Sequence, residues 1–324
     1  MIRFALRRLA TAIPLLWLVW TVTFAIGRLA PGDPMALYEG SLVPADAIER
    51  LRHIYGLDAP LPVQYVKQLG ATLRGDLALS TSEGRPVGTI IAEAIGPTLL
   101  LTGTALVLTF LIGGGVGFLS TRTADSGFDQ VATGTSLFLY SMPSFWIGVE
   151  LVQIFSFRLG WLPSSHMASI VSPGGVIGSM GDAVLHLVLP VTTLVLGSAA
   201  VVARHMRSGL LEALASPFVR SARARGLSEW RIIGRHALRH ALRPLITLIG
   251  LSLPVLLSGT VLVEVIFAWP GLGRVAYNAI VARDYPLVQA TTLMTATLVI
   301  IGSLLADLLA AALDPRIRLA EEQT

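Results

Sequence analysis

Cysteine is absent from the 324 residues of this sequence. A chain without thiols cannot contain disulfides, thiolate zinc sites, iron–sulfur ligands or a cysteine nucleophile. Charge is also scarce: charged residues make up 14% of the chain, whereas a typical soluble domain has about 25%. Hydrophobic residues make up 53%, and the mean hydropathy is +0.71. This composition excludes an ordinary soluble enzyme of this length and predicts a helical membrane protein.

Long apolar runs predict six transmembrane helices, since about 20 apolar residues cross the hydrocarbon core of a bilayer. The predicted spans are Leu9–Leu29, Pro97–Leu119, Val131–Phe157, Val184–Val202, Leu245–Phe267 and Thr291–Leu313. The first apolar run exceeds the roughly 7–15 residues of a secretory signal peptide, so we interpret it as an uncleaved span. The expected fold class is an all-α integral membrane protein with both termini on one side.

Basic residues predict the orientation of these spans. With the N-terminus inside, the inner segments hold 15 arginines, and the outer segments hold nine arginines and lysines. Five of these nine lie in one long outer segment, which counts little because long segments translocate largely regardless of charge. The positive-inside rule therefore predicts that both termini lie in the cytoplasm.

The predicted spans divide the chain into four regions. Residues 1–30 form the cytoplasmic N-terminus and first span, and residues 31–96 form an extracytoplasmic segment. Residues 97–313 hold the other spans and a cytoplasmic loop at 204–243, and residues 314–324 form a cytoplasmic tail. The extracytoplasmic segment contains two apolar helical faces, which predict a small packed cap: Ile48, Leu51, Ile54 and Tyr55, then Val63, Val66, Leu69 and Leu73.

Four glycines cluster in the second span, at positions 113, 114, 115 and 117. They match neither the dinucleotide-binding fingerprint nor the phosphate-binding P-loop pattern. Small residues inside a span allow helix backbones to approach closely. We therefore expect these glycines to be packing positions.

The inner loop at 204–243 contains the most informative pattern. Ser216 is a good N-cap and Pro217 suits the first helical position. A short helix is expected to run to Arg225, where Gly226 stops it. Ser228 begins a second helix, on which Arg231, Arg235, Arg239 and Arg243 recur every fourth residue and predict one basic stripe. The sequence of this loop therefore predicts two helices separated by a break at Gly226.

This loop, with motifs spread over nearly the whole chain, resembles the B-type permease subunits of dipeptide, oligopeptide and nickel ABC importers. In the loop, the matching stretches are VRSARARGL at Val219–Leu227 and RHALR at Arg235–Arg239, followed by Pro244. The other matching motifs, in chain order, are LAPGDP (Leu29–Pro34), YGLDAPLPVQY (Tyr55–Tyr65), RGDLALS (Arg74–Ser80), SMPSFWIG (Ser141–Gly148), LGWLPSS (Leu159–Ser165), VEVIFAWPGLGR (Val263–Arg274), RDYPLVQA (Arg283–Ala290) and DPRIR (Asp314–Arg318).

The resemblance implies a type I ABC-importer permease fold with a coupling helix in the inner loop. In that family the helix docks on a cytoplasmic ATPase subunit and carries ATP-driven closure to the spans. Carried over, the coupling residues are Ser216, Pro217, Phe218, Val219, Arg220, Ser221, Ala222, Arg223, Ala224, Arg225, Gly226 and Leu227. The alternative role for the arginines is topological, holding the loop inside.

The resemblance also implies partners. These are a second, C-type permease, two cytoplasmic ATPase subunits, an extracytoplasmic substrate-binding protein and membrane lipid, in a bacterial inner membrane. The chain has no Walker A sequence, so ATP and magnesium are expected on the ATPase subunits. The chain itself is expected to be non-catalytic, with no cofactor or metal and no nucleic acid bound. The expected cargo is dipeptides or short peptides, with nickel or another small solute as the alternative.

Polar residues inside spans usually face a cavity or a partner. Glu150 and Gln153 lie close on one predicted helical face, and Glu264 lies near the outer end of the fifth span. We expect these three residues at the pathway or at a subunit interface. The alternatives are packing hydrogen bonds for Gln153 and interfacial exposure for Glu264. The WPGLGR turn that follows is interpreted as structural, with a gate or a binding-protein contact as the alternative.

Two other classes of protein compete with the importer interpretation. An ion-coupled secondary transporter would have inverted repeats and broken central helices, and the sequence shows no repeat. A membrane-embedded enzyme would need a cluster of His, Asp or Glu within the spans. His236 and His240 have metal-ligand spacing on a helix, but neighbouring arginines would repel a cation.

Overall fold

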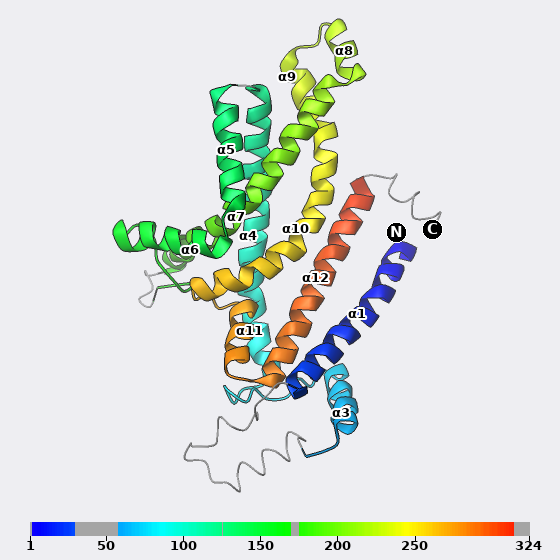
Figure 1. Cartoon of the computed structure of the whole chain (residues 1–324), viewed down its shortest axis with the longest axis vertical. Coiled ribbons are helices and arrows are strands. Elements are labelled where there is room, and N and C mark those ends of the chain that lie inside the picture. The colour runs from blue at the N-terminus through cyan, green and yellow to red at the C-terminus, as the bar shows by residue number, and fades with distance from the viewer. Residues whose placement is uncertain (1, 30–57, 125, 170–174, 314–324) are drawn as a thin grey trace. The chain divides into compact units, whose positions relative to one another are not determined.

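The computed structural model describes residues 2–29, 58–124, 126–169 and 175–313 (Figure 1). The predicted apolar face at Ile48–Tyr55, most of the LAPGDP motif and the tail at 314–324 lie outside the described residues. The described residues are almost entirely helical, which confirms the expected all-α class. Apart from one isolated bridge between Leu79 and Pro86, all regular structure in these ranges is helical.

Helices follow one another through the described ranges of the chain. In order they are α1 (Ile2–Leu29), α3 (Leu61–Leu73), α4 (Val87–Arg122), α5 (Gly127–Ser141), α6 (Ser144–Leu151), the π-helical segment η2 (Val152–Arg158), α7 (Gly175–Ala215), α8 (Pro217–Ala224), α9 (Glu229–Arg231), the π-helical segment η3 (Ile232–Ala237), α10 (Leu238–Ile266), α11 (Leu272–Val281) and α12 (Tyr285–Leu313).

Four helices are long and apolar enough to cross a membrane: Ala10–Leu29, Val87–Arg122, Gly178–Ala215 and Tyr285–Leu308. Two more spans result if each of two bent pairs counts as one crossing. These pairs are Gly127–Ser141 with Ser144–Arg158, and Glu229–Leu242 with Pro244–Leu257. The six predicted spans correspond to these six segments.

The third predicted span, Val131–Phe157, is not one straight helix. Its two halves meet at 104° around Met142 and Pro143, and Met142 is extended, with φ −86° and ψ 136°. Proline donates no N–H and disfavours helical geometry in the residue before it. Apolar composition therefore identified the segment, but the proline determines its direction.

The chain folds into two compact units. One is built around Thr98–Pro270 with the end of α12 from Val299, and the other from the described parts of Leu6–Pro97 and Gly271–Leu298. The main core of the first unit contains the buried residues Leu101, Leu189, Val263, Phe267 and Trp269. A second core of the same unit lies where α7 meets η3 and α10, and includes Val202, Leu210, Ala237, Ala241 and Leu245.

Glycines of α4 allow this close packing against α7. A Cβ on Gly113 would lie 2.6 Å from the Ala199 carbonyl oxygen. A Cβ on Gly117 would overlap the Ala203 carbonyl oxygen. The prediction that these two glycines are packing positions is confirmed, whereas Gly115 has open space beside it.

The second unit has its own core, formed by Val87, Ile90, Ala94, Leu272 and Leu287 among others. Here α3 packs beside α1 (Figure 1). The Tyr65 ring of α3 makes edge contacts with Trp20 at 5.1 Å and with Phe24 at 5.4 Å between ring centroids. Part of the segment expected as a packed cap is thus a formed helix attached to α1, but it attaches through Tyr65 and not through the predicted apolar face.

Candidate functional site

The loop between α7 and α10 contains the predicted coupling segment. α8 starts with Ser216 as its N-cap residue and Pro217 in its first turn, which confirms the predicted start. Ser216 Oγ donates a hydrogen bond back to the Ala213 carbonyl, and its side chain makes no cap bond to α8. Proline has its backbone fixed in a helix-compatible conformation, so Pro217 is the residue that sets the start of the helix.

Gly226 ends α8 in the left-handed conformation, with φ +75°. The Gly226 N–H donates to the Arg223 carbonyl at 2.9 Å, and the Leu227 N–H donates to the Ala222 carbonyl at 3.3 Å. These two bonds form the Schellman motif, which satisfies carbonyls at the end of a helix. A Cβ on Gly226 would have open space around it. Glycine is therefore favoured here by backbone conformation and not by crowding.

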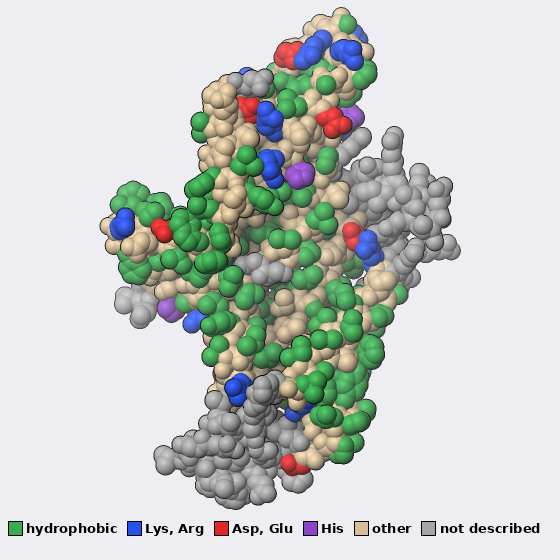
Figure 2. All heavy atoms as spheres, viewed as in Figure 1, with side chains coloured by type: hydrophobic (Ala, Val, Ile, Leu, Met, Phe, Trp, Pro, Cys, Tyr) green, Lys and Arg blue, Asp and Glu red, His purple; other side chains and the backbone are tan. Residues whose placement is uncertain are grey.

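α8 has an apolar face and a basic face. Val219 and Ala222 are buried against Ile232, with Phe218 and Leu227 packed beside them. The exposed side chains are Pro217, Arg220, Ser221, Arg223, Ala224 and Arg225. Its own loop therefore holds the helix in place, and the arginines point outward, as Figure 2 shows at the α8–α9 end of their unit.

One exposed ion pair closes the turn between α8 and α9. Arg223 Nε donates to Glu229 Oε1 at 2.6 Å, and Arg223 Nη2 donates to Glu229 Oε2 at 3.2 Å. The hydrogen bond to Glu229, together with its negative charge, raises the pKa of the Arg223 guanidinium. The fork joins residues on the two sides of Gly226 and so braces the glycine turn.

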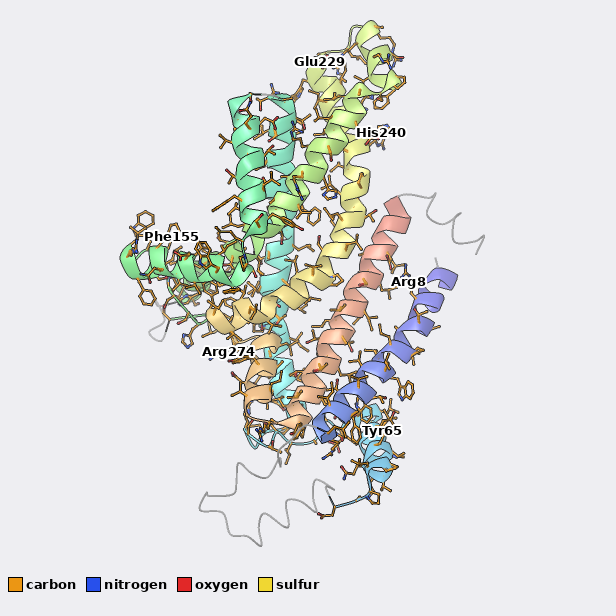
Figure 3. The ribbon with its side chains drawn as sticks, viewed as in Figure 1. Arg8, Tyr65, Phe155, Glu229, His240 and Arg274 are labelled. Atoms are coloured by element: carbon orange, nitrogen blue, oxygen red, sulfur yellow. The ribbon has the colours of Figure 1, made fainter. Side chains whose placement is uncertain are left out.

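Aromatic contacts tie the loop to the surrounding helices. The exposed Trp230 ring meets Phe118 of α4 edge-on, with 6.2 Å between centroids. The Arg122 guanidinium lies 5.2 Å from the Trp230 ring centroid, within the range of a cation–π interaction. On the other side, Phe218 of α8 stacks on His240 of α10 at 4.6 Å, and Figure 3 labels both Glu229 and His240 in this region.

The predicted basic stripe on the second helix is interrupted. Between α9 and α10 the backbone forms the π-helical segment η3 over Ile232–Ala237. A π-helix bonds residues five apart and changes the register of an α-helical stripe. Arg231, Arg235 and Arg239 are all exposed, but they do not follow one regular α-helical row. The prediction assumed an uninterrupted α-helix and is wrong in this respect.

The two polar residues of the third predicted span are only partly buried. Glu150 is half-buried at the end of α6, and Gln153 is exposed in η2. The π-helical segment starts at Val152, so the spacing of these two residues no longer follows α-helical periodicity. Their role at the pathway or at a subunit interface stays a prediction.

Glu264 is fully buried, with 0% of its surface exposed. Thr98 Oγ1 donates to Glu264 Oε1 at 2.7 Å, and the Trp269 N–H donates to the Glu264 carbonyl at 2.8 Å. Interfacial exposure of Glu264 is therefore not observed within this chain. Trp269 is itself fully buried in the same unit, which supports a structural role for the start of the WPGLGR turn. A role of Glu264 at the pathway stays a prediction.

Sequence reasoning missed a partly buried ion pair between α5 and α7. Arg207 Nε and Nη2 donate to Asp129 Oδ1 and Oδ2, both at 2.7 Å. Asp129 is buried, whereas Arg207 is partly exposed. Such bidentate geometry is the strong form of the carboxylate–guanidinium contact. The two residues are 78 positions apart, so no local pattern connects them.

A second missed residue is Asp284, which directly precedes α12. Its buried carboxylate accepts hydrogen bonds from the Ser80 hydroxyl, and from the Ser82 N–H at 2.9 Å and Oγ at 2.8 Å. It also accepts from the Leu287 N–H at 3.1 Å, which caps the helix. Asp284 therefore fastens the loop before α4 to the start of α12. The position of Asp284 directly before a helical apolar run indicates the cap on α12. It gives no indication of the contacts with Ser80 and Ser82.

Comparisons with known proteins place this geometry in a family. Residues 111–319 match the model of the binding-protein-dependent transport system inner membrane component, and residues 1–86 match the N-terminal model of the same membrane components. The chain is 37% identical to the oligopeptide transport system permease protein AppB of Bacillus subtilis, covering 98% of this chain and 99% of that protein. It is 36% identical, with the same coverage, to the glutathione transport system permease protein GsiC of Escherichia coli K12.

Solved structures agree on the fold. The MetNI methionine ABC transporter in an inward-facing conformation matches with a TM-score of 0.54 and 19% identity, covering 71% of this chain and 98% of the other. An amino acid ABC transporter matches with a TM-score of 0.51 and 18% identity, covering 70% and 94%. The long matched range and the high identity to full-length relatives establish that this chain belongs to the binding-protein-dependent transport system inner membrane components, the membrane permease subunits of ABC importers.

Proposed function

We propose that this chain forms half of the translocation pathway for dipeptides or other short peptides, and that α8 couples the pathway to ATP hydrolysis by separate subunits. The cargo is inferred from two relatives that match almost end to end, which are named as oligopeptide and glutathione permeases. Glutathione is itself a short peptide. Short peptides are therefore the cargo class that both names share.

The conformation of α8 carries the coupling proposal. A short helix that transmits force must keep its shape and orientation while its partner pushes on it. The buried Val219 and Ala222, the glycine turn at Gly226 and the Arg223–Glu229 fork each restrain α8 against its own loop. The outward arginines then offer a positively charged docking face to an ATPase subunit.

The proposal also includes the partner subunits, the orientation of the chain and its candidate contacts. A second permease completes the pathway, two ATPase subunits bind ATP and magnesium, and a binding protein delivers the cargo. The chain itself hydrolyses no ATP and holds no cofactor. α8 and both termini lie in the cytoplasm, and residues 31–96 lie on the opposite side. Glu150, Gln153 and Glu264 are candidate contacts to the pathway or to the second permease.

Uptake of a labelled dipeptide tests this proposal. Cells that contain all partner subunits, with or without this chain, are compared before and after an uncoupler collapses the proton gradient. We expect uptake that depends on the chain and survives the uncoupler, because ATP hydrolysis drives it. Chain-dependent uptake that the uncoupler abolishes would favour an ion-coupled transporter. A correctly inserted chain that moves no dipeptide, no longer peptide and no glutathione would overturn the peptide assignment, and nickel would be tested next.

A further inference from the structure

Beside the Tyr65 ring, the inward face of α3 carries several polar side chains. Gln68 Nε2 donates to Gln289 Oε1 of α12 at 2.6 Å, and Trp20 Nε1 of α1 donates to Thr72 Oγ1 at 3.3 Å. Gln64 is buried and donates to the Ala59 carbonyl at 2.7 Å. A helix on the surface of a water-soluble protein places apolar side chains inward instead. The buried side of α3 is thus more polar than that of a helix on the surface of a water-soluble protein.

The outward face of α3 is apolar. Val66 is 67% exposed and Leu73 is 79% exposed, with Val63 exposed beside them. At 100° per residue these three side chains fall within one sector of the helix. Exposure of a contiguous apolar strip to water is unfavourable and marks a surface with an occupant. The pattern of Val63, Val66, Leu69 and Leu73 was expected to pack inward, and the structure shows that expectation to be wrong for three of the four residues.

α3 lies beside segments that are long and apolar enough to cross the membrane. Tyr65 Oη and Thr21 Oγ1 share a hydrogen bond of 2.9 Å, and Figure 3 labels Tyr65 where α3 approaches α1. Thr21 lies eight residues before the end of the candidate span Ala10–Leu29, which is about 12 Å along a helix with a rise of 1.5 Å per residue. Half of a bilayer core is about 15 Å thick. The contact therefore lies within the depth of one leaflet.

The helix beside α3 also exposes apolar side chains, and α3 itself carries exposed cations. α1 presents exposed apolar side chains such as Val22 and Ile26 over the same stretch. Lys67 and Arg74 of α3 are also exposed. Long cationic side chains beside an apolar strip can reach lipid phosphates while their stems stay in the apolar layer. Apolar side chains and flanking cations together match the two layers of a lipid leaflet.

We propose that α3 lies in the membrane leaflet that holds the end of α1. Val63, Val66 and Leu73 contact lipid acyl chains, and Lys67 and Arg74 contact phosphate headgroups. Under the topology proposed above this is the outer leaflet. The helix is inverted because lipid, unlike water, solvates apolar side chains and leaves polar ones to be satisfied within the protein. The extracytoplasmic segment is thus partly a membrane-embedded element and not wholly a cap in water.

The absence of cysteine from the chain makes a direct test available. Val66→Cys and Leu73→Cys are each spin-labelled in the complete transporter, reconstituted in liposomes of phosphatidylethanolamine and phosphatidylglycerol. Ile26→Cys on the exposed face of α1 is the lipid reference, and Glu83→Cys in an exposed turn is the water reference. Collision rates with oxygen, which enters lipid, and with a nickel chelate, which stays in water, are measured at each site.

We expect oxygen-to-nickel ratios at Val66 and Leu73 close to that of Ile26. They should exceed the ratio at Glu83 by about tenfold or more, because moving a polar solute into hydrocarbon costs several kcal/mol. Ratios close to that of Glu83 would place the strip in water and overturn the proposal. Protection from both reagents would show a protein cover, such as a binding protein or another part of the chain, and would overturn it too. The readout needs no cargo, so it is independent of whether the peptide assignment holds.

A second variant covers failure of the labelled chains to assemble. Val66→Trp adds one indole to the outward face, and its fluorescence is read in liposomes with brominated acyl chains. Quenching in excess of the unmodified transporter supports contact with acyl chains. Added fluorescence that bromine leaves unquenched counts against the lipid assignment.

Discussion

α3 and α8 are two short helices that end in the same way. Gly75 follows α3 with φ +83°, and Gly226 follows α8 with φ +75°. After α3, the Gly75 N–H donates to the Thr72 carbonyl and the Asp76 N–H to the Ala71 carbonyl, both at 3.0 Å. This is the same Schellman pair that closes α8. In both cases a Cβ on the glycine would have open space around it.

The two helices differ in which face they bury. α3 buries Gln64 and turns Val66 outward, whereas α8 buries Val219 and turns Arg220 outward. An apolar outward face fits lipid, and a basic outward face fits water or an acidic partner. Helix ends are therefore encoded locally, whereas the medium around a helix follows from the face that the fold leaves exposed.

Substitution of Gly75 and of Gly226 by valine should give the largest difference in transport between the two helices. A β-branched residue at positive φ is strained by about 1–3 kcal/mol at either position. We expect Gly226→Val to reduce ATP-driven transport by about tenfold or more, since a barrier change of about 1.4 kcal/mol is tenfold in rate. Gly75→Val should cost similar strain but leave most transport intact, because α3 transmits no force. Uptake by the reconstituted transporter, normalised to inserted chain, measures both.

Asparagine supplies the control for this pair, because it tolerates the left-handed conformation better than valine. Gly226→Asn should retain much of the transport that Gly226→Val loses. Equal losses from valine at position 75 and position 226 would mean that the glycine turn serves folding only. Normal transport by Gly226→Val would remove the coupling role from α8.

The inner face of α3 is held by a contact between two amides, Gln68 and Gln289. Gln68 Oε1 and Gln289 Nε2 have no hydrogen-bond partner among the described residues, and they line a cavity of about 60 Å³, which has room for water. We expect Gln68→Leu to lower stability by about 1–3 kcal/mol, because it leaves the Gln289 amide buried without its main partner. The double variant Gln68→Leu/Gln289→Leu should recover part of this loss, since both polar groups are gone.

Thermal unfolding of the purified transporter, followed for each variant, measures that recovery. If the loss of stability in the double variant equals the sum of the losses in the two single variants, the two amides contribute independently. That result would remove the polar contact from the reasons why α3 is inverted. A substitution at Val66, which faces away from this contact, is the control. Combined with Gln68→Leu, its effect on stability should simply add.

The helix ends of the coupling segment could be predicted because they depend on neighbouring residues. Pro217 fixes its own backbone, and Gly226 readily adopts the left-handed conformation that other residues disfavour. α8 therefore lies within a residue of its predicted limits. The bend at Pro143 has the same kind of local signal, although the apolar run continues across it. Helix ends and breaks thus depend on neighbouring residues and are accessible from the sequence.

Contacts between distant residues could not be predicted in the same way. Asp129 and Arg207, and likewise Asp284 and Ser80, meet only because the fold brings them together. The outward direction of Val66 also depends on which face α1 and α12 cover. Periodicity identifies an apolar face, and in a membrane protein that face can turn toward lipid as well as toward a core.

The Arg223–Glu229 fork should give the smallest effect. Both side chains are about half exposed, at 46% and 59%, and exposed ion pairs contribute little because water and salt screen them. Arg223→Ala should therefore reduce transport only a few-fold, by loosening the turn around Gly226. Arg225→Ala is the matched control, because Arg225 lies at the end of the same helix and its guanidinium donates to the Ser221 carbonyl, with no ion pair among the described residues. The fork braces α8 if Arg223→Ala and Glu229→Ala reduce transport equally and their effects do not add. High salt should then reduce transport by the unmodified protein to a similar extent. If Arg223→Ala reduces transport and Glu229→Ala does not, the charge of Arg223 acts on the docking partner. In that case only the buried Val219 face restrains α8, and the contrast with the lipid-facing α3 rests on that face.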